Sequence, residues 1–194
     1  MRKTLKFLYP TAILAAICLV VSLALSSTNM ITKDKISAIN KQNREKAMSR
    51  VLSAETYTES TISIDGEEKT YYVASDNGVT LGYIFITGAN GYGGEVSVMT
   101  AVLPDKTIKA VEILDVSSET PGLGQNAAKE DFYGQFKDMS GDLTVVKTGT
   151  DVDAGEVNAV TGATITSKAV TKAVNEALDI MDEISAKEGE TNEE

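Results

Sequence analysis

Apolar and polar positions divide the chain into a long apolar segment near the N-terminus and a mixed remainder. From Phe7 to Thr32 there is no Asp, Glu, Lys or Arg, and the stretch from Leu8 to Leu25 is strongly apolar. About 20 apolar residues cross the hydrocarbon core of a bilayer as a helix. We therefore predict a transmembrane helix over residues 7–29, after a short N-terminal segment at residues 1–6.

The charges that flank this segment predict its orientation. Arg2, Lys3 and Lys6 precede the apolar run, and Lys and Arg are enriched on the cytoplasmic side of membrane helices. We expect a cytoplasmic N-terminus and a translocated remainder. The alternative is a secretory signal cleaved after Ser26, at the small-residue stretch Ala24-Leu25-Ser26. The apolar run is longer than the usual signal core, which favours an uncleaved anchor.

A helical pattern continues from Lys33 to Leu52, where the sequence has no Gly or Pro. Apolar residues form a loose stripe there at Ile36, Ile39, Ala47, Met48, Val51 and Leu52. We predict that residues 30–54 form a helix connecting the anchor to the exported domain.

Residues 55–186 begin with strand patterns. Runs rich in β-branched and aromatic residues are separated by Gly- or Pro-bearing turns. These runs are Thr61–Ile64, Lys69–Ala74, Val79–Thr87, Glu95–Leu103, Lys106–Val116 and Leu143–Lys147. The turn signals Asp65-Gly66 and Pro104-Asp105 predict two hairpins.

Two helices are expected after the main strands. Lys129–Phe136 is a short candidate, and the clearest helix runs from Thr164 to about Ile184. Its apolar residues follow helical spacing at Val170, Ala173, Val174, Ala177, Leu178 and Met181. Strands followed by a closing helix predict an α+β domain, with an antiparallel sheet and packed helices. The acidic tail, residues 187–194, is expected to fray.

Composition limits the chemistry that this domain can perform. The 194 residues include no histidine, no tryptophan and one cysteine, and the net charge is −10. Without histidine there is no Ser-His-Asp or Cys-His catalysis, and one thiol cannot hold a four-thiolate iron–sulfur cluster. The acidic charge argues against binding to nucleic acid or anionic lipid surfaces. Function must depend on carboxylates, hydroxyls, the backbone or a cofactor from elsewhere.

The first candidate site is Thr161-Gly162-Ala163-Thr164-Ile165-Thr166-Ser167, at the predicted start of the last helix. Free backbone N–H groups and hydroxyls at a helix N-terminus suit a phosphate group. The alternative is that Thr161 or Thr164 only caps the helix, since Thr is a preferred cap.

The second candidate site is Glu119-Thr120-Pro121-Gly122-Leu123-Gly124. Its Pro-Gly pair predicts a tight turn, and Gly124 permits close approach of the backbone to a ligand. Leu123 would project from the turn as an apolar wall for a flat ring. The alternative is a loop that only reverses the chain.

Together, and in this order, the two segments resemble the covalent-FMN-binding domain found in two kinds of membrane complex. The domain occurs in the G subunit of the Rnf complex and in the C subunit of the Na⁺-pumping NADH:quinone reductase. The resemblance also includes the N-terminal membrane helix, Gly91-Tyr92-Gly93-Gly94, Gln135-Phe136 and Val145-Val146-Lys147. In that family FMN is joined by a phosphoester bond to the last threonine of Ser/Thr-Gly-Ala-Thr, which is Thr164 here. The resemblance thus implies one FMN-binding domain over residues 55–186.

The same resemblance implies the surroundings of the flavin. Besides Thr164, the residues expected around the FMN are Tyr92, Gly93, Glu119, Thr120, Leu123, Gly124, Thr161, Gly162 and Ala163. A separate flavin transferase would attach FMN, because a threonine hydroxyl is a poor nucleophile unaided. The family usually has Asp three residues before the motif, where this chain has Asn158, and the effect on attachment is left open.

As a member of this family, the chain would be an electron-transfer subunit of a membrane-bound ferredoxin:NAD⁺ oxidoreductase that moves Na⁺ or H⁺. Its partners would be the other Rnf subunits, above all D, A and E, and also B and C. It would have no independent catalytic activity, and the FMN domain would lie outside the cytoplasmic membrane. The alternatives are the C subunit of the quinone reductase, which is typically longer, and a membrane-anchored binding module without flavin.

Other candidate sites have weaker signals. The acid pairs Glu67-Glu68, Asp182-Glu183 and Glu193-Glu194 are more typical of solvated surfaces than of metal or glycosidase sites. The Gly88–Gly94 run lacks the strand–helix context and the Lys-Ser/Thr ending of a P-loop.

Overall fold

The structure is a computed structural model that describes residues 2–191, with the side chains of residues 10–33 and 41–187. The chain separates into two compact units, Met1–Glu45 and Lys46–Glu194.

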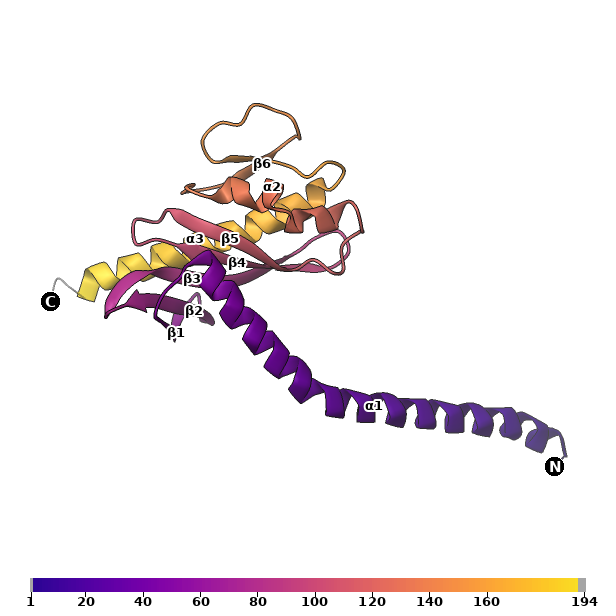
Figure 1. Cartoon of the computed structure of the whole chain (residues 1–194). Coiled ribbons are helices and arrows are strands. Elements are labelled where there is room, and N and C mark those ends of the chain that lie inside the picture. The colour runs from indigo at the N-terminus through magenta and orange to yellow at the C-terminus, as the bar shows by residue number, and fades with distance from the viewer. Residues whose placement is uncertain (1, 192–194) are drawn as a thin grey trace. The chain divides into compact units, whose positions relative to one another are not determined.

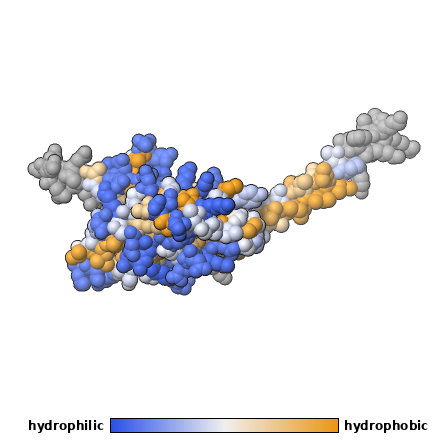
Figure 2. Space-filling model, turned by 90° about the horizontal axis from the view of Figure 1, so that it is seen from above, coloured by the Kyte–Doolittle hydropathy of each residue, from blue (hydrophilic) through white to orange (hydrophobic). Residues whose placement is uncertain are grey.

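The first unit consists of most of helix α1 (Arg2–Val51). Within α1, Pro10–Lys33 has the length and apolar composition of a membrane-spanning helix, and 0% of its most apolar window is buried. Figure 2 shows apolar residues gathered along this helix. The hydroxyls of Ser27 and Thr28 donate to backbone carbonyls of the preceding turn at 2.8 and 2.9 Å, so these polar groups are satisfied within the helix. The segments predicted as two helices therefore form one continuous helix.

The second unit is built on a five-stranded antiparallel sheet (Figure 1). The strands lie side by side in chain order: β1 (Thr56–Ile64), β2 (Glu67–Asp76), β3 (Val79–Asn90), β4 (Glu95–Val102) and β5 (Ile108–Asp115). The hairpin predicted at Asp65-Gly66 is confirmed. Both turn residues have positive φ angles, 51° and 82°, as a type I′ turn requires.

The two faces of this sheet are covered by different helices. Helix α3 (Thr164–Thr191) packs on β3 and β4 and buries its predicted apolar stripe in the main core. On the opposite face, the last turn of α1 buries Met48 and Val51 in a second cluster that includes Ile84 and Met99. Adjacent strand residues point to opposite faces, so one strand can supply both clusters.

Helix α3 is longer than its sequence pattern predicts. It passes the expected end near Ile184 and continues to Thr191, so the tail predicted to fray is helical up to that residue. The ammonium group of Lys187 donates to the carbonyl of Ser63 at 2.8 Å, which holds the later turns against β1. Residues 192–194 lie outside the described residues.

Short elements connect β5 to α3. They are η1 (Gly124–Ala128), α2 (Glu130–Tyr133), η2 (Gly134–Phe136), β6 (Thr144–Val146) and β7 (Glu156–Asn158). The single helix predicted over residues 129–136 is therefore two short pieces. β6 and β7 pair in parallel, and the sequence does not predict β7 because three residues are too few to show an alternating pattern. The predicted α+β class is confirmed.

Candidate functional site

Helix α3 begins at Thr164, directly after a turn at Thr161-Gly162. Gly162 has a φ of 74°, a conformation that glycine adopts readily. Ser167 fastens this turn, because its hydroxyl donates to the carbonyl of Ala163 and accepts the N–H of Val160, each at 2.9 Å. The first N–H groups of an α-helix have no intrahelical acceptor, so this end presents donors and the positive end of the helix dipole.

The four hydroxyl groups of this segment differ in what they already bind. The Thr166 hydroxyl is on a residue only 1% exposed, and it donates to Oε2 of Glu119 at 2.6 Å. The Ser167 hydroxyl is committed to the turn. Thr161 and Thr164 are exposed, and among the described residues neither hydroxyl has a hydrogen-bond partner. The hydroxyl hydrogen bond expected of a simple threonine cap is thus not formed by these two residues.

Glu119 joins three separate segments around the start of α3. It lies in the loop before η1 and is 2% exposed. Besides Thr166, it binds Gly93, whose N–H donates to Oε1 at 2.9 Å. Burial would raise the pKa of Glu119. The hydroxyl of Thr166 and the N–H groups of Tyr92, Gly93 and Gly94 outweigh burial and hold this pKa below its ordinary value. The carboxyl group is therefore ionised at neutral pH.

Glycines line the space that this carboxylate fills. A Cβ atom added at Gly91 would collide with Oε1 of Glu119. At Gly124, an added Cβ would lie 2.5 Å from Oε2 of Glu119 and 2.8 Å from Oγ1 of Thr166. A side chain at either position would displace the carboxylate, so the glycines are needed for its close packing.

A surface groove of about 530 Å³ opens beside the first turn of α3. Its lining residues are Tyr92, Glu119, Thr120, Leu123, Gly124, Gly162, Ala163, Thr164, Ile165 and Thr166. Three apolar side chains remain exposed there: Tyr92 at 72%, Leu123 at 43% and Ile165 at 54%. Exposed apolar walls beside a helix N-terminus suit a ligand with a flat ring and an anionic group, and FMN has both.

The groove brings together most of the residues that the sequence suggests. Eight of the ten expected flavin residues line it. Of the other two, Gly93 supports the groove through Glu119, and Thr161 is exposed in the preceding turn. Ile165 and Thr166 also line the groove; both belong to the first candidate segment, but the resemblance does not place them around the flavin. An apolar residue among the hydroxyls of a helix start is the signal that could have identified Ile165.

Comparison with known proteins identifies the family. Residues 91–179 match the FMN-binding domain family. The chain is 46% identical over 114 residues to the G subunit of the proton-translocating ferredoxin:NAD(+) oxidoreductase complex of Clostridium ljungdahlii, a match that spans 58% of this chain and 60% of that protein. It is 36% identical over 190 residues to the G subunit of the Na(+)-translocating ferredoxin:NAD(+) oxidoreductase complex of Acetobacterium woodii, over 89% of this chain and 90% of that protein. The chain belongs to this family of G subunits.

Solved structures of related proteins share the fold of this chain. Shewanella oneidensis NqrC matches with a TM-score of 0.50 and 25% identity, over 60% of this chain and 61% of that chain. The C subunit of the Na(+)-translocating NADH-quinone reductase from Parabacteroides distasonis matches with a TM-score of 0.52 and 28% identity, over 61% and 62%. Each match spans less than two thirds of the solved chain. The resemblance to the family shared by G and C subunits is confirmed.

Asn158, where the resemblance leads us to expect Asp, forms its hydrogen bonds with residues other than Thr164. Its amide nitrogen donates to the carbonyl of Thr150 at 3.1 Å, and its amide oxygen accepts the Thr150 N–H at 3.2 Å. The Asn158 N–H also donates to Oε1 of Gln135 at 2.8 Å. A carboxylate could accept from Thr150 but could not donate to it, so the amide suits this position.

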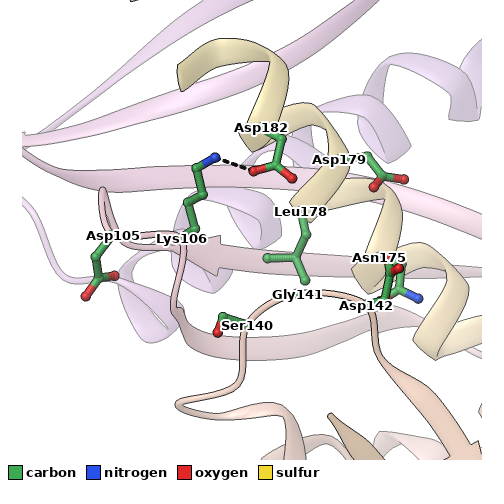
Figure 3. Close-up of a pocket in the computed structure, with 9 residues that line it drawn as sticks. All are labelled: Asp105, Lys106, Ser140, Gly141, Asp142, Asn175, Leu178, Asp179 and Asp182. Atoms are coloured by element: carbon green, nitrogen blue, oxygen red, sulfur yellow. Dashed lines mark hydrogen bonds and ion pairs between the residues drawn. The ribbon is translucent and has the colours of Figure 1, made fainter. Parts of the chain in front are cut away.

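A second pocket, of about 280 Å³, lies along the other half of α3 (Figure 3). There Asp182 forms an ion pair with Lys106 at 2.5 Å. Partial burial raises the pKa of Asp179, and the nearby carboxylates of Asp142, Asp182 and Glu176 raise it further. Among residues whose side chains are described, no cluster of three or more acidic, His or Cys residues could hold a metal ion. Of the three acid pairs noted in the sequence, Glu193-Glu194 lies outside the described residues.

Proposed function

We propose that this chain is an electron-transfer flavoprotein subunit of a membrane-bound, ion-translocating ferredoxin:NAD⁺ oxidoreductase, with FMN held by a phosphoester bond to Thr164. The Clostridium and Acetobacterium relatives are named as G subunits of such complexes. Their names specify a proton in one case and Na⁺ in the other, so membership of the family does not select the ion.

The observation that carries the proposal is the exposed Thr164 hydroxyl, without a partner among the described residues, in the wall of the groove. Of the four hydroxyls between residues 161 and 167, this one alone is both exposed and part of the groove lining. A phosphate on Thr164 would lie at the first turn of α3, where unpaired N–H groups and the helix dipole stabilise negative charge.

The bound FMN would supply the redox chemistry, and the chain would supply attachment, orientation and electrostatics. The side chains of Tyr92, Leu123 and Ile165 present apolar surface that would contact the ring and exclude water from it. The hydroxyl of Thr120 stands in the same wall as a polar group. The covalent bond would keep the cofactor on the chain.

Attachment requires a base that this site does not offer. Among the described residues that line the groove, Glu119 has the only carboxylate, and it already accepts hydrogen bonds from Thr166 and Gly93. We therefore assign attachment to a flavin transferase that uses FAD. The Thr164 oxygen forms a bond to the phosphorus of the FMN half, the pyrophosphate bond breaks, AMP leaves, and the threonine proton passes to a base of the transferase.

Mass spectrometry of the full chain tests this proposal. Co-expression with a flavin transferase should increase the intact mass by one FMN less one water and produce a fluorescent band on a denaturing gel. Peptide mapping should place the increase on the peptide that contains Thr164. An unchanged intact mass would contradict the flavin proposal and favour a binding module without flavin.

Matched substitutions test the attachment residue. Thr164→Val should abolish the mass increase, whereas Thr164→Ser should retain it because serine keeps a hydroxyl in the same place. Thr161→Val and Thr166→Val should both keep the label. If Thr164→Val keeps the label and one of the neighbouring variants loses it, the FMN is attached to that neighbour and our assignment is wrong.

We further propose that the N-terminus is cytoplasmic and that the FMN domain lies on the outer side of the membrane. Lysines and an arginine precede the apolar segment, in keeping with a cytoplasmic N-terminus. Asp151 is exposed in the loop between β6 and β7. An Asp151→Cys variant, made in a Cys18→Ser background, should react with a membrane-impermeant maleimide in intact spheroplasts. Labelling only after lysis would show that the domain lies on the cytoplasmic side and would contradict the proposed orientation.

The proposed partners are the other subunits of the complex, with the D, A and E subunits as the membrane-embedded neighbours. Purification of the tagged chain from its native membrane should recover these subunits together with B and C. Recovery of quinone reductase subunits instead would assign the chain to that complex, whose C subunits share its fold. The same sample would show by intact mass whether the chain is cleaved after Ser26.

A further inference from the structure

The groove contains an ionised group that the attachment of FMN does not use. Glu119 lines the groove, yet it is 2% exposed and both carboxylate oxygens already accept hydrogen bonds from the chain. The glycines around Glu119 leave room for its carboxylate, and the hydrogen-bond donors that face it stabilise a negative charge. A buried charge needs several hydrogen-bond donors to offset its loss of hydration, whereas a neutral side chain could join the same loops without them.

We propose that Glu119 is a positioning residue that sets the geometry and lowers the reduction potential of the flavin on Thr164. This inference rests on the proposed function. Glu119 has two effects: it fixes the turn at residues 91–94 and the loop at residues 117–124 to the first turn of α3, and it places a permanent negative charge in the groove wall.

The positioning effect follows from the segments that Glu119 connects. Its partner Gly93 is 26 residues earlier in the chain and its partner Thr166 is 47 residues later. Tyr92 and Leu123, two of the exposed apolar walls, lie on the first two segments, and Thr166 lies on the helix that begins with Thr164. The position of the walls relative to the attachment oxygen therefore depends on these two hydrogen bonds.

The electrostatic effect follows from the charge balance of flavin reduction. Uptake of two electrons with one proton leaves one more negative charge on the ring than in its oxidised form. A carboxylate in the groove wall raises the free energy of that reduced form more than that of the oxidised form. The burial of Glu119 limits screening of its charge by water and salt. Its charge should therefore make the flavin harder to reduce.

The test uses the full chain, flavinylated by co-expression and purified in detergent. The midpoint potential is measured by titration with dithionite in the presence of mediators, with the visible absorbance as the signal. Glu119→Gln keeps the size of the side chain and most of its hydrogen bonds but removes the charge. At a fixed ambient potential, we expect it to increase the ratio of reduced to oxidised flavin by about tenfold, or about 30 mV for a two-electron couple.

Glu183→Gln is the matched control, because it removes the same charge from an exposed position of α3. Along the helix it lies about 25 Å from Thr166, well beyond the screening length in salt. It should leave the potential unchanged. Equal shifts in the two variants, or no shift in Glu119→Gln, would overturn the electrostatic part of the inference.

Thr166→Val provides a second test with the opposite sign. It removes the one side-chain donor to Glu119 and leaves the carboxylate less neutralised, so the potential should fall below that of the wild type. Thr166→Ser keeps the donor, so its bound flavin should have the wild-type potential and the wild-type visible circular dichroism. Shifts of the same sign in Glu119→Gln and Thr166→Val would indicate a change in loop position rather than a charge effect, and would overturn the electrostatic part of the inference.

Intact mass separates this inference from the proposed function. A wild-type chain without the FMN mass increase would contradict the proposed function itself. Full flavinylation of all four variants with unchanged potentials would leave the flavin assignment standing and contradict only the role of Glu119. If Glu119→Gln does not fold, the comparison of Thr166→Val with Thr166→Ser gives the decisive measurement.

Discussion

Two carboxyl groups along α3 have pKa shifts that are opposite to what their exposure suggests. Glu119, beside the first turn, is almost completely buried, and its pKa is lowered. Asp179, in the second half of the helix, is the more exposed of the two residues, yet partial burial of its carboxyl group and three nearby carboxylates raise its pKa. Burial acts in the same direction on both groups. The difference is that Glu119 faces hydrogen-bond donors, whereas Asp179 faces other carboxylates.

The comparison extends to the charges on the helix itself. Lys168 and Lys172 are exposed in the first half of α3, and Asp179, Asp182 and Glu183 are exposed in the second half. This is the reverse of the order that the helix dipole favours. Helix stability therefore does not explain the charge order. A positive end beside the groove suits an anionic ligand, and the acidic half is a solvated surface.

Removal of each carboxylate should give the largest contrast between the two regions. Glu119→Ala leaves several buried donors without an acceptor, so we expect a loss of about 3 kcal/mol in the free energy of unfolding. Asp179→Ala removes an exposed group that is repelled by its neighbours and should cost almost nothing. Urea unfolding of the full chain in detergent, followed by tyrosine circular dichroism, measures both. Similar losses of unfolding free energy in the two variants would contradict the claim that only Glu119 is held by favourable contacts.

The pH dependence of stability tests the charge state of Glu119. Because the pKa of Glu119 is lowered on folding, its contribution to stability is present above the ordinary glutamate value of 4.5 and is lost as the pH falls through the folded-state pKa. Glu119→Gln should therefore be less stable than wild type at pH 7 and should approach wild-type stability in acid. A constant difference across this pH range would contradict the assigned charge state.

The glycines that surround Glu119 should be nearly as sensitive as the carboxylate. In Gly124→Ala the new Cβ would lie 2.5 Å from Oε2 of Glu119, so we expect a loss of about 2 kcal/mol from overpacking. Gly134→Ala is the matched control. Its Cβ would meet only Cγ of Glu130 at 3.5 Å, and Gly134 already has the helical φ of −66°. Thermal unfolding should show a lower Tm for the first variant and no decrease for the second.

The sequence predicts the elements of this fold better than it predicts the contacts of the site. The Asp65-Gly66 hairpin and the apolar stripe of α3 depend on neighbouring residues, so local patterns identify them. The motif around Thr164 is likewise continuous in the chain. Glu119 and Thr166 are 47 residues apart, and no local pattern shows that their side chains meet. The resemblance suggested Glu119 as a flavin contact, whereas the structure shows its carboxylate oxygens bound to the chain.

Asn158 illustrates the same limit and gives a smaller predicted effect. The family resemblance marks it only as a departure from an expected Asp, but the structure shows a side-chain amide that both donates to and accepts from Thr150. Asn158→Asp should lose the donor and cost about 1 kcal/mol. If the amide serves only this contact, the variant should still accept FMN. Urea unfolding and intact mass measure the two properties, and unchanged stability would contradict the role assigned to the amide.

The smallest predicted effect is a gain in stability from the acidic half of α3. Because the pKa of Asp179 is raised on folding, its favourable contribution is present below the ordinary aspartate value of 3.8 and is lost as the pH rises through the folded-state pKa. Asp179→Asn removes the cost of partly burying the charge and the repulsion by neighbouring carboxylates, both of which remain above that pKa. Since the residue is exposed, we expect only a few tenths of a kcal/mol at pH 7 and low salt. The gain should disappear near pH 3.8 or in high salt, and a loss of stability at pH 7 would show that Asp179 has a favourable partner.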